Sequence, residues 1–165
     1  GMVCFDVGCS TGGFTDCLLQ RGATRVYAVD VGYGQFEWRL RQDPRVVLME
    51  RTNIRYLDPG KIAEPIDLIV IDVSFISLTL VLPAVVSFLA AAGSIITLIK
   101  PQFEVGKGLV GRGGIVRDDG LREATVEKVV ACAVQFGLEF AGRMESPIEG
   151  RKGNREFLAW FRRKV

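Results

Sequence analysis

The sequence predicts an α/β fold in which a mostly parallel sheet is covered by helices on both faces and ends in an antiparallel strand pair. Three observations support this prediction. Short apolar runs alternate with longer segments of helical periodicity along the 165 residues. The run at 66–71 is almost wholly β-branched or leucine, which is typical of strands buried on both faces. Near the C-terminus, two strand-like runs are joined by a polar segment, so we expect one three-layered domain with right-handed crossovers.

Glycine, proline and polar residues bound the elements expected before residue 100. A strand at 3–7 runs into a glycine-rich turn, and a helix at 13–21 is closed by Gly22. There follow a strand at 25–29, a short helix near 36–41, and strands at 46–49 and 66–71. A helix is expected at 82–92 with Pro83 in its first turn, and then a strand at 94–99 that Lys100-Pro101 stops.

The pattern changes after residue 100. Residues 102–120 are rich in glycine and charge, and are too polar for an element of the core. Asp118 or Asp119 is suited to cap a helix that runs to about residue 136 and ends at Gly137. The runs at 139–145 and 156–163 are the expected antiparallel pair at the sheet edge.

Composition excludes several classes of function. Histidine is absent, which removes the Ser-His-Asp triad and the commonest zinc ligand. No apolar run approaches the roughly 20 residues of a membrane span, and no secretory signal is present. The four cysteines lack CxxC spacing and are predicted to be reduced thiols. We therefore expect a cytoplasmic protein with neither a metal site nor a membrane partner.

Polar residues follow the first three strands, at the edge where parallel α/β sheets bind ligands. After the first strand comes an acidic residue and then G-x-x-x-G, while Ser10 stands where a dinucleotide fingerprint requires glycine. Asp30 ends the second strand and can accept both hydroxyls of a ribose, or it is only a capping residue. Asn53 follows the third strand as a further polar contact or a plain turn residue. Together these positions favour a cofactor that contains a nucleoside.

Three charged residues lie where otherwise apolar strands end or begin. Asp72 follows the strand at 66–71, Lys100 follows the strand at 94–99, and Glu156 opens the last strand. Side chains at such strand ends project over a bound ligand, and burying their charges without partners is costly. They are candidate catalytic residues, with a buried ion-pair cluster as the alternative.

These residues carry a specific resemblance. The glycine turn with Asp6 resembles motif I of Rossmann-like methyltransferases that use S-adenosylmethionine. Asp72, Lys100 and Glu156 resemble, in this order, three members of the Lys-Asp-Lys-Glu tetrad of the FtsJ-like ribose 2′-O-methyltransferases. The segments at 11–16, 72–77 and 100–104 are similar to the branch named TlyA or hemolysin A, whose members modify ribosomal RNA.

The resemblance implies a Rossmann-like methyltransferase fold, S-adenosylmethionine as cofactor, and methylation of ribose 2′-hydroxyls in ribosomal RNA or ribosomal subunits. It implies Asp72, Lys100 and Glu156 as the catalytic residues. Lys100 is the candidate base for the hydroxyl proton; because nearby carboxylates stabilise its ammonium form, it otherwise orients the hydroxyl electrostatically. The implied cofactor-binding residues are Asp6, Gly8, Ser10, Thr11, Gly12, Gly13, Phe14, Asp30, Asn53 and Asp72.

Two features of that family are not matched. Its first tetrad lysine precedes motif I, and no residue before Gly1 corresponds to it. The N-terminal S4-type RNA-binding domain of the TlyA branch is also absent. We therefore expect residues 1–165 to be the methyltransferase domain of a longer protein, not fully active alone. The sequence does not determine the oligomeric state.

Basic loops near the catalytic strand ends suit RNA phosphates, or are simply solvated. Two phenylalanines follow the catalytic strands, where they either stack on a base or pack in the core. The expected RNA-binding residues are Phe75, Phe103, Lys107, Arg112, Arg117, Arg151, Lys152 and Arg155. One rival function is a nucleotide-dependent oxidoreductase, which Ser10 and the C-terminal hairpin disfavour. Another is a non-catalytic RNA-binding or pore-forming protein, for which no amphipathic membrane-seeking segment is present.

Overall fold

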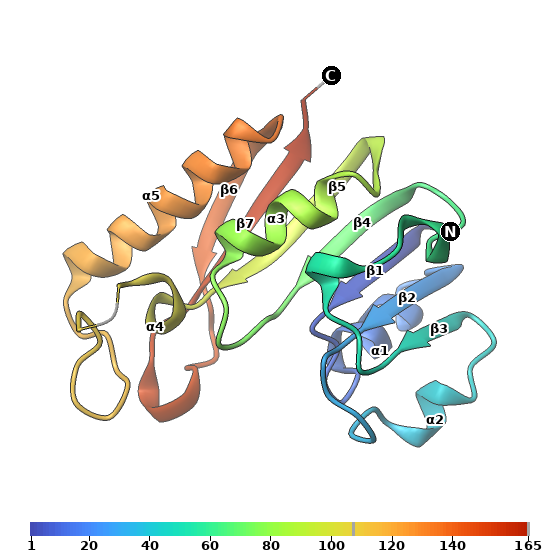
Figure 1. Ribbon diagram of the computed structural model, residues 1–165, viewed down its shortest axis with the longest axis horizontal. Helices are drawn as coiled ribbons and strands as arrows, with labels where there is room; N and C mark the ends of the chain where they lie inside the picture. Colours follow the sequence, from blue (N-terminus) through green and yellow to red (C-terminus); the bar gives the residue numbers. More distant parts are fainter. Residues whose placement is uncertain (107, 165) are drawn as a thin grey trace.

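The computed structural model, which describes residues 1–106 and 108–164, contains a seven-stranded sheet in the order β3-β2-β1-β4-β5-β7-β6 (Figure 1). The strands are β1 (Val3–Val7), β2 (Arg25–Val29), β3 (Val46–Met49), β4 (Ile66–Ile71), β5 (Leu89–Ile99), β6 (Leu138–Glu145) and β7 (Phe157–Arg163). Strands β1 to β5 are parallel, whereas β7 runs antiparallel to both β5 and β6. The predicted parallel sheet with a C-terminal antiparallel pair at its edge is therefore confirmed.

Helices cover both faces of the sheet and complete three layers (Figure 1). They are α1 (Gly13–Gln20), α2 (Trp38–Arg41), α3 (Leu78–Val86), α4 (Pro101–Glu104) and α5 (Asp119–Gln135), with 3-10 turns η1 (Ile54–Tyr56), η2 (Pro59–Lys61) and η3 (Arg151–Gly153). Residues such as Ile69, Leu82 and Val129 pack α3 and α5 on one face of the sheet. Leu18 and Val26 pack α1 on the other face. Among the described residues, no helix is both long and apolar enough to cross a bilayer.

The third helix lies four residues earlier than the sequence predicts, because α3 spans Leu78–Val86 and not 82–92. Ser77 caps it by accepting a hydrogen bond from the Thr79 N–H at 3.2 Å. Pro83 thus lies inside the helix, where it cannot donate to the carbonyl of Thr79. Instead, Cys132 Sγ of the neighbouring α5 lies 3.8 Å from that carbonyl and donates a weak hydrogen bond to it.

The alanine-rich segment before residue 94 belongs to β5, which begins at Leu89 and not at Ser94. Alanine favours helix, so the prediction of a helix to residue 92 followed its local preference. Leu89 instead pairs with Ile66 of β4, and the register between the strands then shifts before Leu68 pairs with Ser94. Non-local pairing therefore overrides the local preference.

The polar segment after β5 contributes to the core, contrary to the prediction. One helical turn, α4, follows immediately, and its Pro101 and Glu104 are buried. Further on, Val116 is 1% exposed. The predicted start of the long helix is confirmed, because Asp118 accepts a hydrogen bond from the Leu121 N–H at 2.7 Å.

Candidate active site

The turn between β1 and α1 brings the ends of β1 and β4 into contact. Gly8 has a φ of +82°, and a Cβ atom there would lie 2.2 Å from the carbonyl oxygen of Asp72. Gly12, at φ +100°, is the N-cap of α1, and a Cβ there would lie 2.5 Å from Leu40 Cδ1. Backbone conformation thus requires glycine at both positions, and at Gly8 the Asp72 carbonyl also leaves no space for a side chain. Between them, Ser10 also adopts a positive φ of 47°.

Asp6 lies beneath this turn and is fully buried. Its Oδ2 accepts a hydrogen bond from Thr15 Oγ1 at 2.6 Å. Its Oδ1 has no hydrogen-bond partner in the part of the chain that the structure describes. Burial raises the pKa of Asp6 to about 6. A buried carboxylate with one free oxygen beneath a glycine turn suits a cationic group of a ligand.

Asp30 and Asn53 line a cavity of about 640 Å³ together with Gly8, Ser10 and Asp72; we call it the glycine-turn cavity. Both side chains also stabilise local turns, which was the alternative role considered for each of them. Asp30 accepts hydrogen bonds from the Ser10 N–H at 2.8 Å and the Gly32 N–H at 2.7 Å. Asn53 caps η1 by accepting from the Arg55 N–H at 3.0 Å. A carboxylate has about four lone-pair sites, so Asp30 keeps capacity for a ligand hydroxyl.

The three candidate catalytic residues line a neighbouring cavity of about 510 Å³, which we call the catalytic cavity. Lys100 Nζ lies 2.6 Å from Asp72 Oδ1 and donates a hydrogen bond to Ser74 Oγ at 3.0 Å. Asp72 Oδ1 has no aligned hydrogen-bond partner among the described residues, so this contact is an ion pair. Glu156 is 5% exposed, and its Oε1 accepts a hydrogen bond from Gln102 Nε2 at 2.8 Å. Strands β4, β5 and β7 thus bring together three residues that are distant in sequence.

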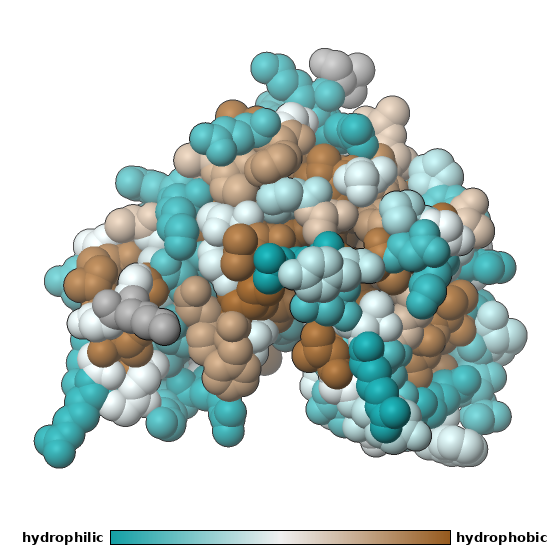
Figure 2. Space-filling view, viewed as in Figure 1, coloured by the Kyte–Doolittle hydropathy of each residue, from teal (hydrophilic) through white to brown (hydrophobic). Residues whose placement is uncertain are grey.

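The two cavities share four residues, Asp72, Ser74, Phe75 and Arg151, so they adjoin at the end of β4. The space-filling view shows this edge of the molecule as a hollow between groups of loops (Figure 2). A ligand in the glycine-turn cavity would thus lie beside the Asp72–Lys100 pair.

Phe75 and Phe103 form an aromatic pair at the mouth of the second cavity, with ring centres 4.9 Å apart. Phe75 is 80% exposed and has a φ of +64°, so it is not a core residue. Holding an exposed phenylalanine in a left-handed conformation costs free energy, which is a feature of functional sites. Phe14, from the glycine turn, lines the same cavity.

The basic residues expected to contact RNA separate into two groups. Arg151 lines both cavities, and Arg112, Arg117 and Lys152 are exposed on the adjacent loops. Buried Asn154 joins these loops: its Oδ1 accepts from the Val116 N–H at 3.1 Å, and its Nδ2 donates to the Gly114 and Arg151 carbonyls at 2.9 and 3.1 Å. Lys107 lies outside the described residues.

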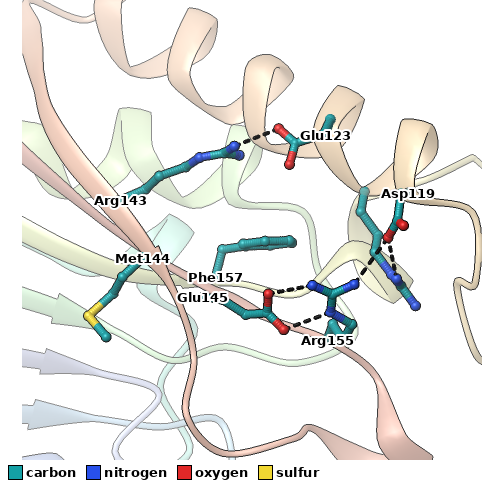
Figure 3. Close-up of a pocket in the computed structure, with 8 residues that line it drawn as sticks. Asp119, Glu123, Arg143, Met144, Glu145, Arg155 and Phe157 are labelled. Atoms are coloured by element: carbon teal, nitrogen blue, oxygen red, sulfur yellow. Dashed lines mark hydrogen bonds and ion pairs between the residues drawn. The ribbon is translucent and has the colours of Figure 1, made fainter.

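Arg155 lines a third cavity, of about 340 Å³, and neither of the two described above. Figure 3 shows its guanidinium between two carboxylates, those of Glu145 and Asp119. Arg155 Nε donates to Glu145 Oε1 at 2.6 Å, and Nη1 donates to Asp119 Oδ1 at 3.2 Å. Asp119 also pairs with Arg122 at 2.6 Å. These contacts join β6 to the start of α5, so the charge of Arg155 is already compensated.

Glu104 was not among the residues singled out from the sequence. This buried carboxylate accepts hydrogen bonds from the Leu78 N–H at 2.7 Å and from Ser77 Oγ at 2.6 Å. It thus fixes the start of α3 to α4, and with it the loop that carries Ser74 and Phe75. The sequence contains one signal for the short helix that carries Glu104: Pro101 directly follows a strand, and proline is a preferred first residue of a helix.

Two exposed arginine–tyrosine pairs near Asn53 were also not expected. Arg51 lies over Tyr33 with 4.0 Å from its Cζ to the ring centre, and Arg55 lies over Tyr56 at 5.4 Å. Both tyrosines are more than 60% exposed. Arg51 and Arg55 flank Asn53 in sequence, and Asn53 lines the glycine-turn cavity.

Solved structures confirm the fold. A structure from Streptococcus thermophilus that carries the name hemolysin has a TM-score of 0.95 and is 48% identical, covering 99% of this chain and 59% of that one. The N-methyltransferase NodS from Bradyrhizobium japonicum, in complex with S-adenosyl-L-homocysteine, has a TM-score of 0.70 at 20% identity and covers 99% of this chain and 79% of that one. The architecture is thus the Rossmann-like fold of S-adenosylmethionine-dependent methyltransferases.

Sequence comparisons identify the family. The chain is 52% identical over 162 residues to the 16S/23S rRNA (cytidine-2′-O)-methyltransferase TlyA of Mycobacterium tuberculosis, covering 98% of this chain and 60% of that protein. It is 46% identical over 160 residues to Hemolysin A of Brachyspira hyodysenteriae, covering 96% and 67%. The chain thus spans about three fifths of the length of the first relative. A family model described as FtsJ-like methyltransferase matches residues 1–163. The chain therefore belongs to the FtsJ-like methyltransferase family, as its motifs predict.

Proposed function

We propose that this protein transfers a methyl group from S-adenosylmethionine to a ribose 2′-oxygen of ribosomal RNA. The observation that carries the proposal is the convergence of Asp72, Lys100 and Glu156 in a cavity that adjoins the glycine-turn cavity. The relatives named as rRNA 2′-O-methyltransferases support the substrate class. The substrate would be met on ribosomal subunits in the cytoplasm.

The glycine-turn cavity fits S-adenosylmethionine. Asp6 does not itself line this cavity, but its free Oδ1, buried beneath the turn, suits the ammonium of the cofactor. Asp30 and Asn53, which line the cavity, suit its ribose and adenine. The close approach of Gly8 to Asp72 leaves no room for a side chain between the turn and β4. The remaining cofactor residues would shape the turn; they are Ser10, Thr11, Gly12, Gly13 and Phe14. When bound, this cofactor supplies an electrophilic methyl group on a sulfonium.

The catalytic residues would position the ribose hydroxyl for an in-line displacement. The 2.6 Å contact with Asp72 and the hydrogen bond to Ser74 hold Lys100 Nζ in one place, which supports the orienting role for this lysine. Glu156 presents a carboxylate to the same cavity, where it adds negative charge beside the reacting groups.

The surroundings of the cavities suit RNA. Phe75 and Phe103 offer aromatic faces for a base, and the loops with Arg112, Arg117, Arg151 and Lys152 offer charge for phosphates. The exposed arginine–tyrosine pairs at Arg51 and Arg55 present both kinds of contact. An RNA strand bound at the hollow would thus meet both basic and aromatic groups.

The test is methylation by the full-length protein. It is incubated with ribosomal subunits and methyl-labelled cofactor, and 2′-O-methylation is mapped along the RNA. We expect Lys100→Ala to abolish transfer while cofactor affinity, measured by calorimetry, stays within about threefold, because Lys100 lines the catalytic cavity and not the glycine-turn cavity. The exposed Lys61→Ala on η2 is the control. Full activity of Lys100→Ala would refute the assignment.

Hemolysin A among the relatives gives an alternative, a non-catalytic RNA-binding or membrane-damaging protein. Leakage of a dye from liposomes, measured with the same full-length protein, distinguishes it. Leakage without methylation would favour this alternative over the methyltransferase.

A further inference from the structure

We propose that Gln102 and Gly150 are positioning residues for Glu156: together they form a slot that holds its carboxylate in the catalytic cavity. The inference rests on the proposed function, because it assigns a role to two residues through a candidate catalytic residue. Both line the catalytic cavity, and neither has an assigned role.

Gln102 forms one side of the slot. Its Nε2 donates to Glu156 Oε1 at 2.8 Å, while its own Oε1 is buried without a hydrogen-bond partner in the described part of the chain. Turning the amide over would place an oxygen against the carboxylate, so the donor orientation is the favourable one. An unpaired buried oxygen lowers stability. The contribution of Gln102 to stability therefore does not explain its presence, whereas its bond to Glu156 does.

Gly150 forms the other side. A Cβ atom at this position would lie 2.0 Å from Glu156 Oε1 and 2.5 Å from its Cδ. The φ of Gly150 is −71°, which any residue adopts, so backbone conformation does not require glycine here. The carboxylate of Glu156 occupies the space of the missing side chain, so a Cβ at this position would displace it.

The chemistry of the slot suits a catalytic carboxylate. Asp72 pairs with a cation, Lys100, whereas the donor that holds Glu156 is a neutral amide. An amide fixes the direction of the carboxylate without compensating its charge. Glu156 is therefore held in one orientation by a neutral donor.

Single variants of the full-length protein test the slot. We expect Gln102→Ala to lower kcat between about 10-fold and about 100-fold, with KM for ribosomal subunits and for cofactor within about threefold, because misplacing a catalytic group affects the chemical step. Gln102→Glu should lower kcat further, because two carboxylates would then face each other. Gly150→Ala should resemble Gln102→Ala. Gln20→Ala, on the exposed face of α1, and Gly106→Ala, with open space around its Cβ, are matched controls that should retain activity.

A double-mutant cycle separates positioning from a merely structural role. In a Glu156→Ala background, neither Gln102→Ala nor Gly150→Ala should lower kcat further, since the carboxylate that they position is gone. Losses that add to that of Glu156→Ala would overturn the inference. So would activities of Gln102→Ala and Gly150→Ala that stay within about twofold of wild type while Glu156→Ala is impaired. Full activity of Glu156→Ala would instead refute the proposed catalytic assignment itself.

Discussion

Protonation of Asp6 should have opposite effects on the stability of the protein and on its affinity for the cofactor. Burial raises the pKa of Asp6 from 3.8 to about 6. The folded protein thus prefers the neutral carboxyl, and the stability from this group is fully present at low pH and is lost as pH rises through about 6. The cofactor ammonium, in contrast, is attracted only to the ionised form. Stability should therefore fall, and cofactor affinity should rise, over the same pH range.

The sizes of the stability effect and of the affinity effect both follow from the pKa shift of Asp6. With these pKa values, ionising Asp6 between about pH 4.5 and about pH 7 should lower the free energy of unfolding by about 2 kcal/mol relative to Asp6→Asn, which cannot ionise. Over about pH 7 to about pH 5, the ionised fraction falls about tenfold, and cofactor affinity should fall with it. Urea denaturation of both proteins at each pH measures the first effect, and calorimetric titration with S-adenosylmethionine measures the second.

Two results would refute this reasoning. If wild type and Asp6→Asn lose stability in parallel across the pH range, the carboxyl of Asp6 is not the group that titrates. If the affinity of wild type for the cofactor does not change between about pH 5 and about pH 7, the cofactor ammonium does not contact Asp6.

Three further predictions concern single residues. Gly8→Ala should abolish cofactor binding in calorimetry and destabilise the protein by more than about 1 kcal/mol in urea, because its φ is +82° and its Cβ would meet the Asp72 carbonyl. Phe75→Ala should change stability by less than about 0.5 kcal/mol yet lower methylation of ribosomal subunits about tenfold, because the exposed ring of Phe75 is available to stack on a base. Phe75→Tyr, which keeps an aromatic ring, should retain activity. Normal turnover by Phe75→Ala would contradict this role. Arg151→Ala should reduce the slope of log K for RNA binding against log salt concentration by about one unit, measured by filter binding. Arg155→Ala should instead lower the melting temperature and leave that slope unchanged. The reverse result would show that Arg155 is the phosphate contact.

The order of elements was predictable because local patterns specify it. Alternating apolar runs, the cap at Asp118 and the stop at Gly137 predicted most elements to within a few residues. The boundary between α3 and β5 was not predictable in this way. The alanines before Gly93 favour helix, and only pairing of Leu89 with Ile66 makes this segment a strand.

The sequence by itself determined which residues reach the functional edge. In a parallel sheet, residues that follow the strands share one edge, so Asp30, Asp72 and Lys100 were identifiable from their positions alone. Glu156 could be added because the last strand runs in the opposite direction, so its start meets the ends of the others.

Only the tertiary structure decided which of these side chains touch. Gln102 and Glu156 are 54 positions apart, and no periodicity relates them. The charge of Arg155 suggested RNA binding, but two carboxylates from β6 and α5 already compensate it. The need for glycine at Gly150 likewise arises from another residue's carboxylate and not from its own backbone. Local patterns determine where a residue lies along an element, whereas hydrogen bonds, ion pairs and close approaches depend on how distant elements pack.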